Sequence, residues 1–478
     1  MRTVLRVFFR EVVVEGRGRV PTDRGGLFVA WHPNGLIDPA LILAGAPGEV
    51  VFGARDGLLR WPILGPLMRI AAVPIYRAQD QEAMTDDERR AANAASLGAL
   101  ADRVAGGSFA ALFPEGVSHD APHLADVRSG AARLYLTARA ATPPGRPPPA
   151  IVPVGLHYAD KDGFRTDVLV EFHPPLDVPE VDPADDPKTA AARLTEAIET
   201  ALERAVHPTA DWALHRLMHR ARTLIAAEAA ARRGERPQPE TVAGRVAGFQ
   251  RIWAGYEARQ SSHADEIAGL RADLWAYDDR LRALGFADDH LDRPPLLGSP
   301  VLLVGAAVQA AVVAVLLPPL LVLGAVVNVP PYWLLKGVAI VAAKAEKDVA
   351  TVKIMGGAVL FPAFWAAAGW LAARGWIALP LDLPEAPWAV GVVVAVLSAL
   401  GGVAVLLYSE VARGAWRALR VRAARWRHAD HLPDLRARRA DLHDRFLALD
   451  PTRDPARLGA EVEGVGVGDA DGASAPVG

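Results

Sequence analysis

The sequence predicts three parts in order: an α/β domain with a mixed sheet flanked by helices, an α-helical region, and C-terminal transmembrane helical hairpins. Short apolar runs alternate with helical segments over residues 25–175, which is the pattern of an α/β domain. Charged segments rich in alanine follow from about residue 183 and predict helices. Long apolar stretches between residues 300 and 410 have the length that spans a bilayer.

Composition limits the functions that the chain can have. Its 478 residues are enough for two or three domains, and 51% hydrophobic residues make it too apolar for a purely soluble protein. The absence of cysteine excludes disulfides, thiolate metal sites and a cysteine acyl-enzyme. A formal net charge of -3 gives no electrostatic reason to expect nucleic acid. We expect no cofactor and no metal, because histidines and carboxylates nowhere have ligand spacing.

The α/β domain is organised around residues 30–39, Ala-Trp-His-Pro-Asn-Gly-Leu-Ile-Asp-Pro. A buried strand is predicted over residues 27–31, followed by His32, a Pro-Asn-Gly turn and Asp38. Asp38 and Pro39 predict a helix that begins there, with Asp38 at the N-cap and Pro39 at N1. The turn can bring the carboxylate to the imidazole, where it fixes one ring nitrogen and leaves the other as a base. In the simpler interpretation, Asp38 only caps the helix.

The same alternation predicts the other elements of the α/β domain. Many alanines, an acidic first turn and two glycines just past its end predict a helix over residues 86–105. Residues 1–14 have no cleavage site of a signal peptide, and they either rest on a membrane surface or form an ordinary packing helix or strand. Further strands are expected at residues 50–52, 71–76, 108–113, 151–158 and 166–172, the last two as a candidate hairpin, and further helices at 38–44, 58–70 and 130–141.

The α-helical region is predicted to contain helices with a solvated charged face over an apolar stripe, at residues 188–206, 212–233 and 240–284. Another charged helix is expected at residues 430–449, and the small, acidic residues 459–478 are expected to be disordered. The predicted domains are an α/β catalytic domain, a charged helical region, a membrane region, and a basic cytoplasmic helix with an acidic tail, at residues 1–183, 184–297, 298–410 and 411–478.

The membrane region is predicted to form two helical hairpins, at residues 300–335 and 357–408. The first run is near twice the minimal span and has Pro318-Pro319 at its middle. Lysines follow the first run and arginines follow the second, whereas the linker at residues 374–386 carries one basic residue. Because positive charge marks the cytoplasmic side, we expect a protein integral to the cell membrane with all its soluble parts cytoplasmic. The alternative is a single buried core helix for each run.

Polar residues follow several predicted strands, at the carboxyl ends where α/β sheets collect their sites. The loops and strand ends at this edge carry four motifs. The first is His32 with Asp38, and the second is Arg77. The third is Phe113-Pro114-Glu115-Gly116 followed by Ser118, and the fourth is Val152-Pro153-Val154. In this order the set resembles the glycerolipid acyltransferase family, which joins acyl chains to glycerol phosphates. The resemblance covers roughly residues 20–175 strongly and 300–410 weakly.

One departure from the family's usual pattern points to a branch. Five residues separate His32 from Asp38, where the family usually has four. This longer form resembles fungal-type glycerol-3-phosphate and dihydroxyacetone-phosphate acyltransferases. Two other stretches resemble the same branch. One is residues 118–120 with residues 128–132, and the other is residues 347–354, between the membrane segments.

The resemblance implies a membrane-bound O-acyltransferase of phospholipid biosynthesis, acting on glycerol 3-phosphate or dihydroxyacetone phosphate. His32 would be the general base, oriented by Asp38, and the donor would be acyl-CoA or an acylated acyl carrier protein. Arg77 would hold the acceptor's phosphate, and Glu115 would hold Arg77 or a substrate hydroxyl. The other expected substrate-binding residues are Phe113, Pro114, Gly116, whose backbone amide can approach closely, and Ser118.

Three alternatives remain open from the sequence. The acceptor could instead be 1-acyl-glycerol 3-phosphate, the substrate of the next step. A lipid hydrolase could use Ser118 as its nucleophile, although the G-x-S-x-G elbow is missing. The chain could also be a non-catalytic membrane scaffold whose helical region binds a partner.

Overall fold

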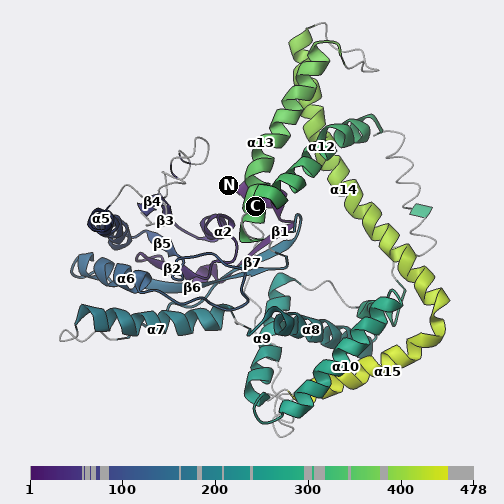
Figure 1. Ribbon diagram of the computed structural model, residues 1–478, viewed down its shortest axis with the longest axis horizontal. Coiled ribbons are helices and arrows are strands. Elements are labelled where there is room, and N and C mark those ends of the chain that lie inside the picture. The colour runs from purple at the N-terminus through teal and green to yellow at the C-terminus, as the bar shows by residue number, and fades with distance from the viewer. Residues whose placement is uncertain are drawn as a thin grey trace. The chain divides into compact units, whose positions relative to one another are not determined.

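The computed structural model describes residues 2–55, 59, 65, 72–75, 85–160, 163–179, 186–206, 209–236, 241–294, 304–305, 318–342, 346–376 and 386–449. These residues form two compact units (Figure 1). One unit runs to His215 and also includes residues 346–351. The other covers the described residues from 216 to 342 and from 352 to 449. The domain boundaries expected at residues 183, 297 and 410 stay predictions.

The first unit is built on a mixed sheet of seven strands in the order β1-β7-β6-β2-β5-β3-β4. Neighbouring strands are parallel except β6 and β7, which form the expected antiparallel pair. The strands are β1 (Glu11–Glu15), β2 (Gly26–Ala30), β3 (Val50–Arg55), β4 (Ala72–Ile75), β5 (Phe109–Leu112), β6 (Ala150–Tyr158) and β7 (Asp167–Phe172). The α/β fold with flanking helices is therefore confirmed.

Helices α5 (Asp86–Ala105), α6 (Gly130–Ala141) and α7 (Pro187–Val206) pack on one face of the sheet. Leu27 and Val29 of β2 lie in the same buried cluster as apolar residues of these three helices. Side chains alternate along a strand, so Phe28 points to the other face, where it stacks on Phe109. Since β2 is buried on both faces, the stretch that follows it leaves the middle of the sheet from a rigid base.

Two of the predicted helices, over residues 86–105 and 130–141, have the observed bounds. Of the two alternatives for the chain start, the structure shows the packing elements: α1 (Arg2–Phe8) is followed by β1, an edge strand parallel to β7. The helix expected over residues 58–70 lies outside the described residues, apart from Leu59 and Gly65.

In the second unit, a helical bundle contains α8 (Trp212–Arg232), α9 (Val242–Arg259), α10 (Ala264–Ala283) and α15 (Leu432–Ala448). The stretch predicted to be helical over residues 240–284 is divided by a turn at residues 260–263, which separates α9 from α10. The Arg439 side chain is buried and ties α15 to other segments, since it donates to Glu228 at 2.8 Å and to Asp292 at 2.8 Å.

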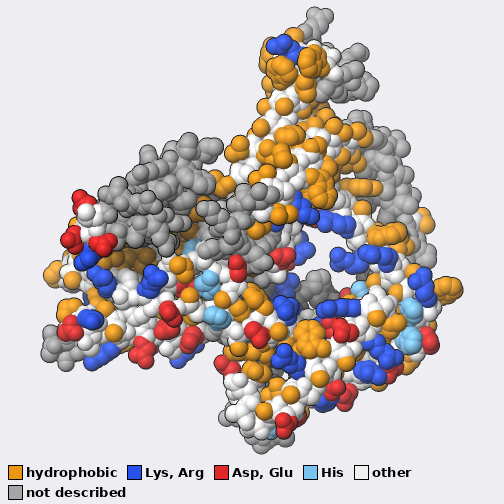
Figure 2. Space-filling model, viewed as in Figure 1, with side chains coloured by type: hydrophobic (Ala, Val, Ile, Leu, Met, Phe, Trp, Pro, Cys, Tyr) orange, Lys and Arg blue, Asp and Glu red, His pale blue; other side chains and the backbone are white. Residues whose placement is uncertain are grey.

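Three described helices are long and apolar enough to cross a membrane: α12 (Pro318–Ala342), α13 (Glu346–Ala373) and α14 (Pro387–Arg427). Their surfaces expose many large apolar side chains (Figure 2), including Trp333, Trp370, Trp388 and Tyr408, and Trp376 just after α13 is exposed too. The first half of the first predicted hairpin lies outside the described residues, apart from Val304 and Gly305. Its second half is α12, which continues past residue 335.

Small residues let these helices approach closely. A Cβ atom added to Gly324 of α12 would lie 2.3 Å from the carbonyl oxygen of Gly401 in α14. The side-chain amide of Asn328 donates to the carbonyl oxygens of Gly324 and Ser398, and it accepts from the Trp365 indole at 2.9 Å. Close packing and interhelical hydrogen bonds are what associates helices in lipid, so α12, α13 and α14 form a packed group.

Replacing Gly324 with Ala should therefore destabilise this group. The added methyl would meet backbone atoms that cannot rotate away, and we expect a loss of about 1–3 kcal/mol. Gly337→Ala in the same helix is the matched control, because nothing lies within 4 Å of its Cβ position. Thermal unfolding of the detergent-solubilised protein measures both variants. Equal midpoints for the two would contradict the packing described here.

Candidate active site

His32 and Asp38 lie together beyond the carboxyl end of β2. His32 Nδ1 is 2.8 Å from Asp38 Oδ2, and the Asp38 side chain is fully buried. The expected position of Asp38 at the N-cap is wrong: α2 (Ile37–Gly45) has Leu36 at its N-cap, and Asp38 is the second helical residue. Because its carboxylate turns back toward the preceding loop, it contacts the imidazole instead of capping the helix.

Two further donors hold the Asp38 carboxylate. The backbone N–H of Asn34 donates to Oδ2 at 2.7 Å, and the Tyr158 hydroxyl donates to Oδ1. Burial, followed by the nearby negative charge of Asp38, raises the pKa of Tyr158 well above its ordinary value, so the phenol stays protonated and remains a donor. A buried carboxylate satisfied in this way accepts from Nδ1–H of His32 and leaves Nε2 with its lone pair.

Tyr158 was not among the residues expected in the site. It is the last residue of β6, which pairs with β2, so its side chain lies at the same sheet edge as His32. The signal was available in the sequence, since a tyrosine ends a predicted strand beside the Val-Pro-Val motif.

The Phe-Pro-Glu-Gly loop packs directly on this pair. The Phe113 ring stacks on the His32 imidazole, with 4.1 Å between ring centroids and 15° between ring planes. The backbone N–H of His119 donates to the His32 carbonyl oxygen at 3.2 Å. The side chain of His32 keeps 18% of its surface exposed, so one edge of the ring stays accessible.

Glu115 of this loop is buried and hydrogen-bonded to His119 Nε2. Arg77, its expected partner, lies outside the described residues. Gly116 has a φ of 70°, in the left-handed region that favours glycine, and it lies against the Arg128 side chain. Pro114 is buried, and Ser118 is partly exposed two residues after Gly116.

A residue from the start of α13 also reaches the loop between His32 and Asp38. The backbone N–H of Leu36 donates to Thr351 Oγ1 at 3.3 Å, and both residues belong to the first unit. Thr351 lies in the stretch of residues 347–354 that resembled the fungal-type branch. The N-cap residue of α2 is thus bound by the first turns of a candidate membrane helix.

Residues 11–157 match the family model described as Acyltransferase. The α/β domain belongs to the glycerolipid acyltransferase family. The chain is 42% identical over 65 residues to glycerol-3-phosphate O-acyltransferase 2 of Saccharomyces cerevisiae, which is 14% of this chain and 8% of that protein. It is 28% identical over 185 residues to glycerol-3-phosphate O-acyltransferase 1 of the same yeast, 38% of this chain and 23% of that one.

The chain thus spans less than a quarter of the length of either yeast relative. Among solved structures, the 1-acyl-sn-glycerophosphate (LPA) acyltransferase PlsC from Thermotoga maritima matches with a TM-score of 0.30 and 21% identity. That match covers 43% of this chain and 75% of the Thermotoga chain. In the α/β domain described here, the residues that carry the family's first and third motifs lie in contact around His32.

Replacing Tyr158 with Phe should destabilise the acyltransferase domain, because Asp38 Oδ1 would lose a buried donor. We expect a loss of about 1–3 kcal/mol near neutral pH. Above about pH 10 an unfolded tyrosine releases its proton while the folded Tyr158, with its raised pKa, keeps it, so wild-type stability falls as pH rises. The difference in stability between wild type and variant should therefore become smaller above about pH 10.

Thermal unfolding followed at about pH 8 and above pH 10 measures this effect. A difference in unfolding midpoint that stays constant with pH would show that Tyr158 is not held as a protonated donor.

Proposed function

We propose that the protein is a membrane-bound O-acyltransferase that transfers a fatty acyl group from an acyl thioester to a hydroxyl of glycerol 3-phosphate or dihydroxyacetone phosphate. The observation that carries the proposal is the pair of His32 and Asp38, whose carboxylate is buried while one edge of the imidazole stays accessible. The partial similarity to two yeast glycerol-3-phosphate O-acyltransferases supports the choice of acceptor.

In the proposed reaction, His32 Nε2 takes the proton from the acceptor hydroxyl as its oxygen attacks the thioester carbonyl. Asp38, still ionised, stabilises the imidazolium that forms. The tetrahedral intermediate then collapses, its C–S bond breaks, and the leaving thiolate takes the proton from His32. An ester and a free thiol result. Since the chain has no cysteine to accept an acyl group as a thioester, direct transfer between the two substrates is the simpler route.

The acceptor's phosphate would be bound by Arg77, whose planar guanidinium can donate two parallel hydrogen bonds to phosphate oxygens. Arg77 comes two residues after β4, a strand of the same parallel run as β2 and β5. Stacking by Phe113 would hold the imidazole plane, and the buried pair of Glu115 and His119 would keep the Phe-Pro-Glu-Gly loop in place. Pro114, Gly116 and Ser118 would shape the acceptor site.

Two finer points belong to the same proposal. The alternative acceptor is 1-acyl-glycerol 3-phosphate, and the stretch Ser118-His119-Asp120, which resembles the glycerol-3-phosphate branch, favours the first acylation step over it. The α/β domain would face the cytoplasm, where acyl-CoA and acyl carrier protein are found. The basic residues that follow Tyr408 in α14 support this orientation, because positive charge marks the cytoplasmic side of a span.

The decisive experiment offers purified protein labelled acyl-CoA with a panel of acceptors, and identifies the product by mass spectrometry. We expect a monoacylated glycerol or dihydroxyacetone phosphate. His32→Ala and Asp38→Asn should each lower kcat by about 100-fold or more, because they remove the general base or its orienting partner.

Other outcomes would reject parts of the proposal. Product only from 1-acyl-glycerol 3-phosphate would assign the second acylation step. Release of free fatty acid by the wild-type protein, together with loss of that release in Ser118→Ala, would indicate a hydrolase. Full activity in His32→Ala would remove this histidine from the chemistry.

Thr351→Val tests whether the start of α13 positions the catalytic loop. The change keeps the shape of the side chain and removes the hydroxyl that accepts from the Leu36 N–H. We expect kcat to fall by about three- to tenfold with little change in KM, since one neutral hydrogen bond contributes about 0.5–1.5 kcal/mol. Thr351→Ser, which restores the acceptor, should recover most of the rate. Equal rates in the Val and Ser variants would contradict this role.

A further inference from the structure

The C-terminal part of α14 exposes a stripe of apolar side chains. Trp416, Leu419 and Trp426 have 61%, 40% and 85% of their surfaces exposed, and Ala423 between them is exposed too. Because the spacings are three or four residues, all of them lie on one face of the helix. They occupy the a and d positions of a heptad repeat, so the stripe has the pattern of one helix of a coiled coil.

The opposite face of the same helix packs against its own unit. Ala418 and Val421, at the c and f positions of the repeat, are buried. The Arg425 guanidinium donates to the carbonyl oxygen of Leu291 at 2.8 Å. This part of α14 is therefore held by contacts on one side, and the stripe points away from them.

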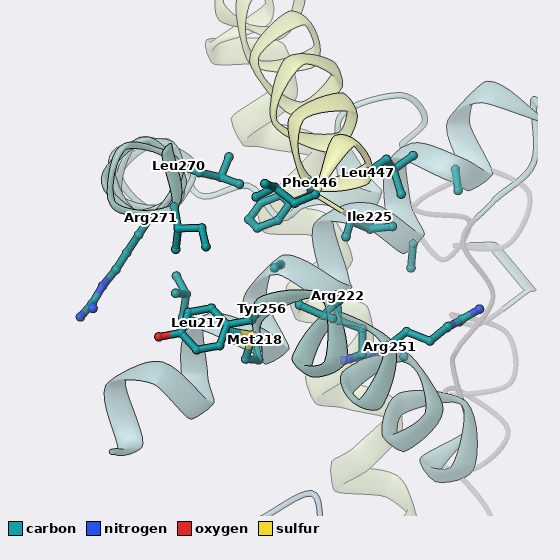
Figure 3. Close-up of a pocket in the computed structure, with 18 of the residues that line it drawn as sticks. Leu217, Met218, Arg222, Ile225, Arg251, Tyr256, Leu270, Arg271, Phe446 and Leu447 are labelled. Atoms are coloured by element: carbon teal, nitrogen blue, oxygen red, sulfur yellow. The ribbon is translucent and has the colours of Figure 1, made fainter. Parts of the chain in front are cut away.

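The helical bundle of this unit, by contrast, turns its apolar side chains inward. In Figure 3, Leu217 and Met218 of α8 face Leu270 of α10 and Phe446 of α15 across a shared cavity. None of the stripe residues on α14 lines that cavity. The bundle helices thus use their apolar faces on one another, whereas the stripe on α14 is available to another molecule.

Arginines line one edge of the stripe. Arg413, Arg420 and Arg427 recur every seven residues, at the e positions that flank the apolar seam, and all three are exposed. Residues 411–429 contain no aspartate or glutamate that could neutralise this edge within the helix. Charges at the edges of a coiled-coil seam select the partner, so this edge favours a helix whose own edges are acidic.

Two other occupants fit this surface less well. The apolar run of α14 ends at Tyr408, and Trp426 lies about 27 Å further along the axis at 1.5 Å per residue. The headgroup layer of a bilayer is only about 5–8 Å thick on each side, so lipids would reach the start of the stripe but not its end. A second copy of the chain would bring arginines against arginines, which is unfavourable.

We infer that the stripe binds an acidic amphipathic helix of a second protein, as a short two-stranded coiled coil. Apolar side chains of that helix would pack between Trp416, Leu419 and Trp426, and its carboxylates would face the arginine edge. The surface is separate from the proposed acyl-transfer site around His32. It would recruit a partner protein to the aqueous side of the membrane.

The test uses the full-length protein in nanodiscs and two designed peptides of three heptads, both with leucine at a and d. One peptide carries glutamate at e and g, and the other carries lysine there, so that like charges keep each peptide from pairing with itself. Fluorescence anisotropy of the labelled peptides measures binding. We expect the glutamate peptide to bind at least about tenfold more tightly. Equal binding of both peptides, or no binding of the glutamate peptide, would overturn the inference.

Variants separate the charged edge from the apolar seam. Arg420→Glu should weaken binding of the glutamate peptide by about tenfold and strengthen binding of the lysine peptide, because it reverses the charge at the middle of the edge. Arg417→Glu is the matched control, since Arg417 is exposed on the same helix at a b position, away from the seam. Trp416→Ala should weaken both peptides, as expected for loss of a buried aromatic contact. Equal effects of Arg420→Glu and Arg417→Glu would remove the arginine edge from the interface.

A spin label distinguishes the other occupants. Because the chain has no cysteine, Ala423→Cys gives a single labelling position in the middle of the stripe. We expect this label to be accessible to a water-soluble relaxation agent in nanodiscs and to be protected when the glutamate peptide binds. Protection by lipid alone, or spin–spin coupling between two copies of the chain, would overturn the inference. His32→Ala should leave peptide binding unchanged, so failure of this inference and failure of the proposed acyl transfer are distinguishable.

Discussion

The buried carboxylate of Asp38 is the constraint on which the geometry of the site depends. A charge without solvent is tolerated only when donors surround it, and Asp38 has three: the His32 ring, the Asn34 backbone and the Tyr158 hydroxyl. These donors come from the loop after β2 and from the end of β6, so satisfying one carboxylate fixes the relative positions of two segments. The orientation of the imidazole follows from that arrangement.

The central strands of the sheet hold the site residues in fixed positions. β2 is the central strand, and its neighbours β5 and β6 run parallel to it, so the loops after all three strands emerge at one edge. The loop after β5 places Phe113 against the imidazole, and the end of β6 places Tyr158 against the carboxylate. Residues far apart in the chain thus meet because parallel pairing aligns strand ends, and a rigid base holds them there.

Sequence patterns predicted the α/β class, two helices to the residue, and the contact of His32 with Asp38, because these follow from local periodicity and short spacing. They left residues 1–14 open between a membrane-surface segment and a packing helix or strand, and they did not predict the pairing of β1 with β7, since a partner about 150 residues away leaves no local signal. They placed Asp38 at the N-cap because Asp-Pro commonly starts helices, whereas its carboxylate is instead bound by the His32 ring and the Tyr158 hydroxyl. Thr351 acts through a tertiary contact that spacing does not encode.

The length of α14 has a mechanical consequence. At 1.5 Å per residue, its 41 residues form a rod of about 60 Å, roughly double the hydrocarbon thickness of a bilayer. About half of this rod must therefore project into the aqueous phase, and that half carries the arginines at positions 413, 417, 420, 422, 425 and 427. A continuous helix resists bending, so if α14 crosses the bilayer it holds the bundle that contains α15 at a fixed distance from the lipid surface.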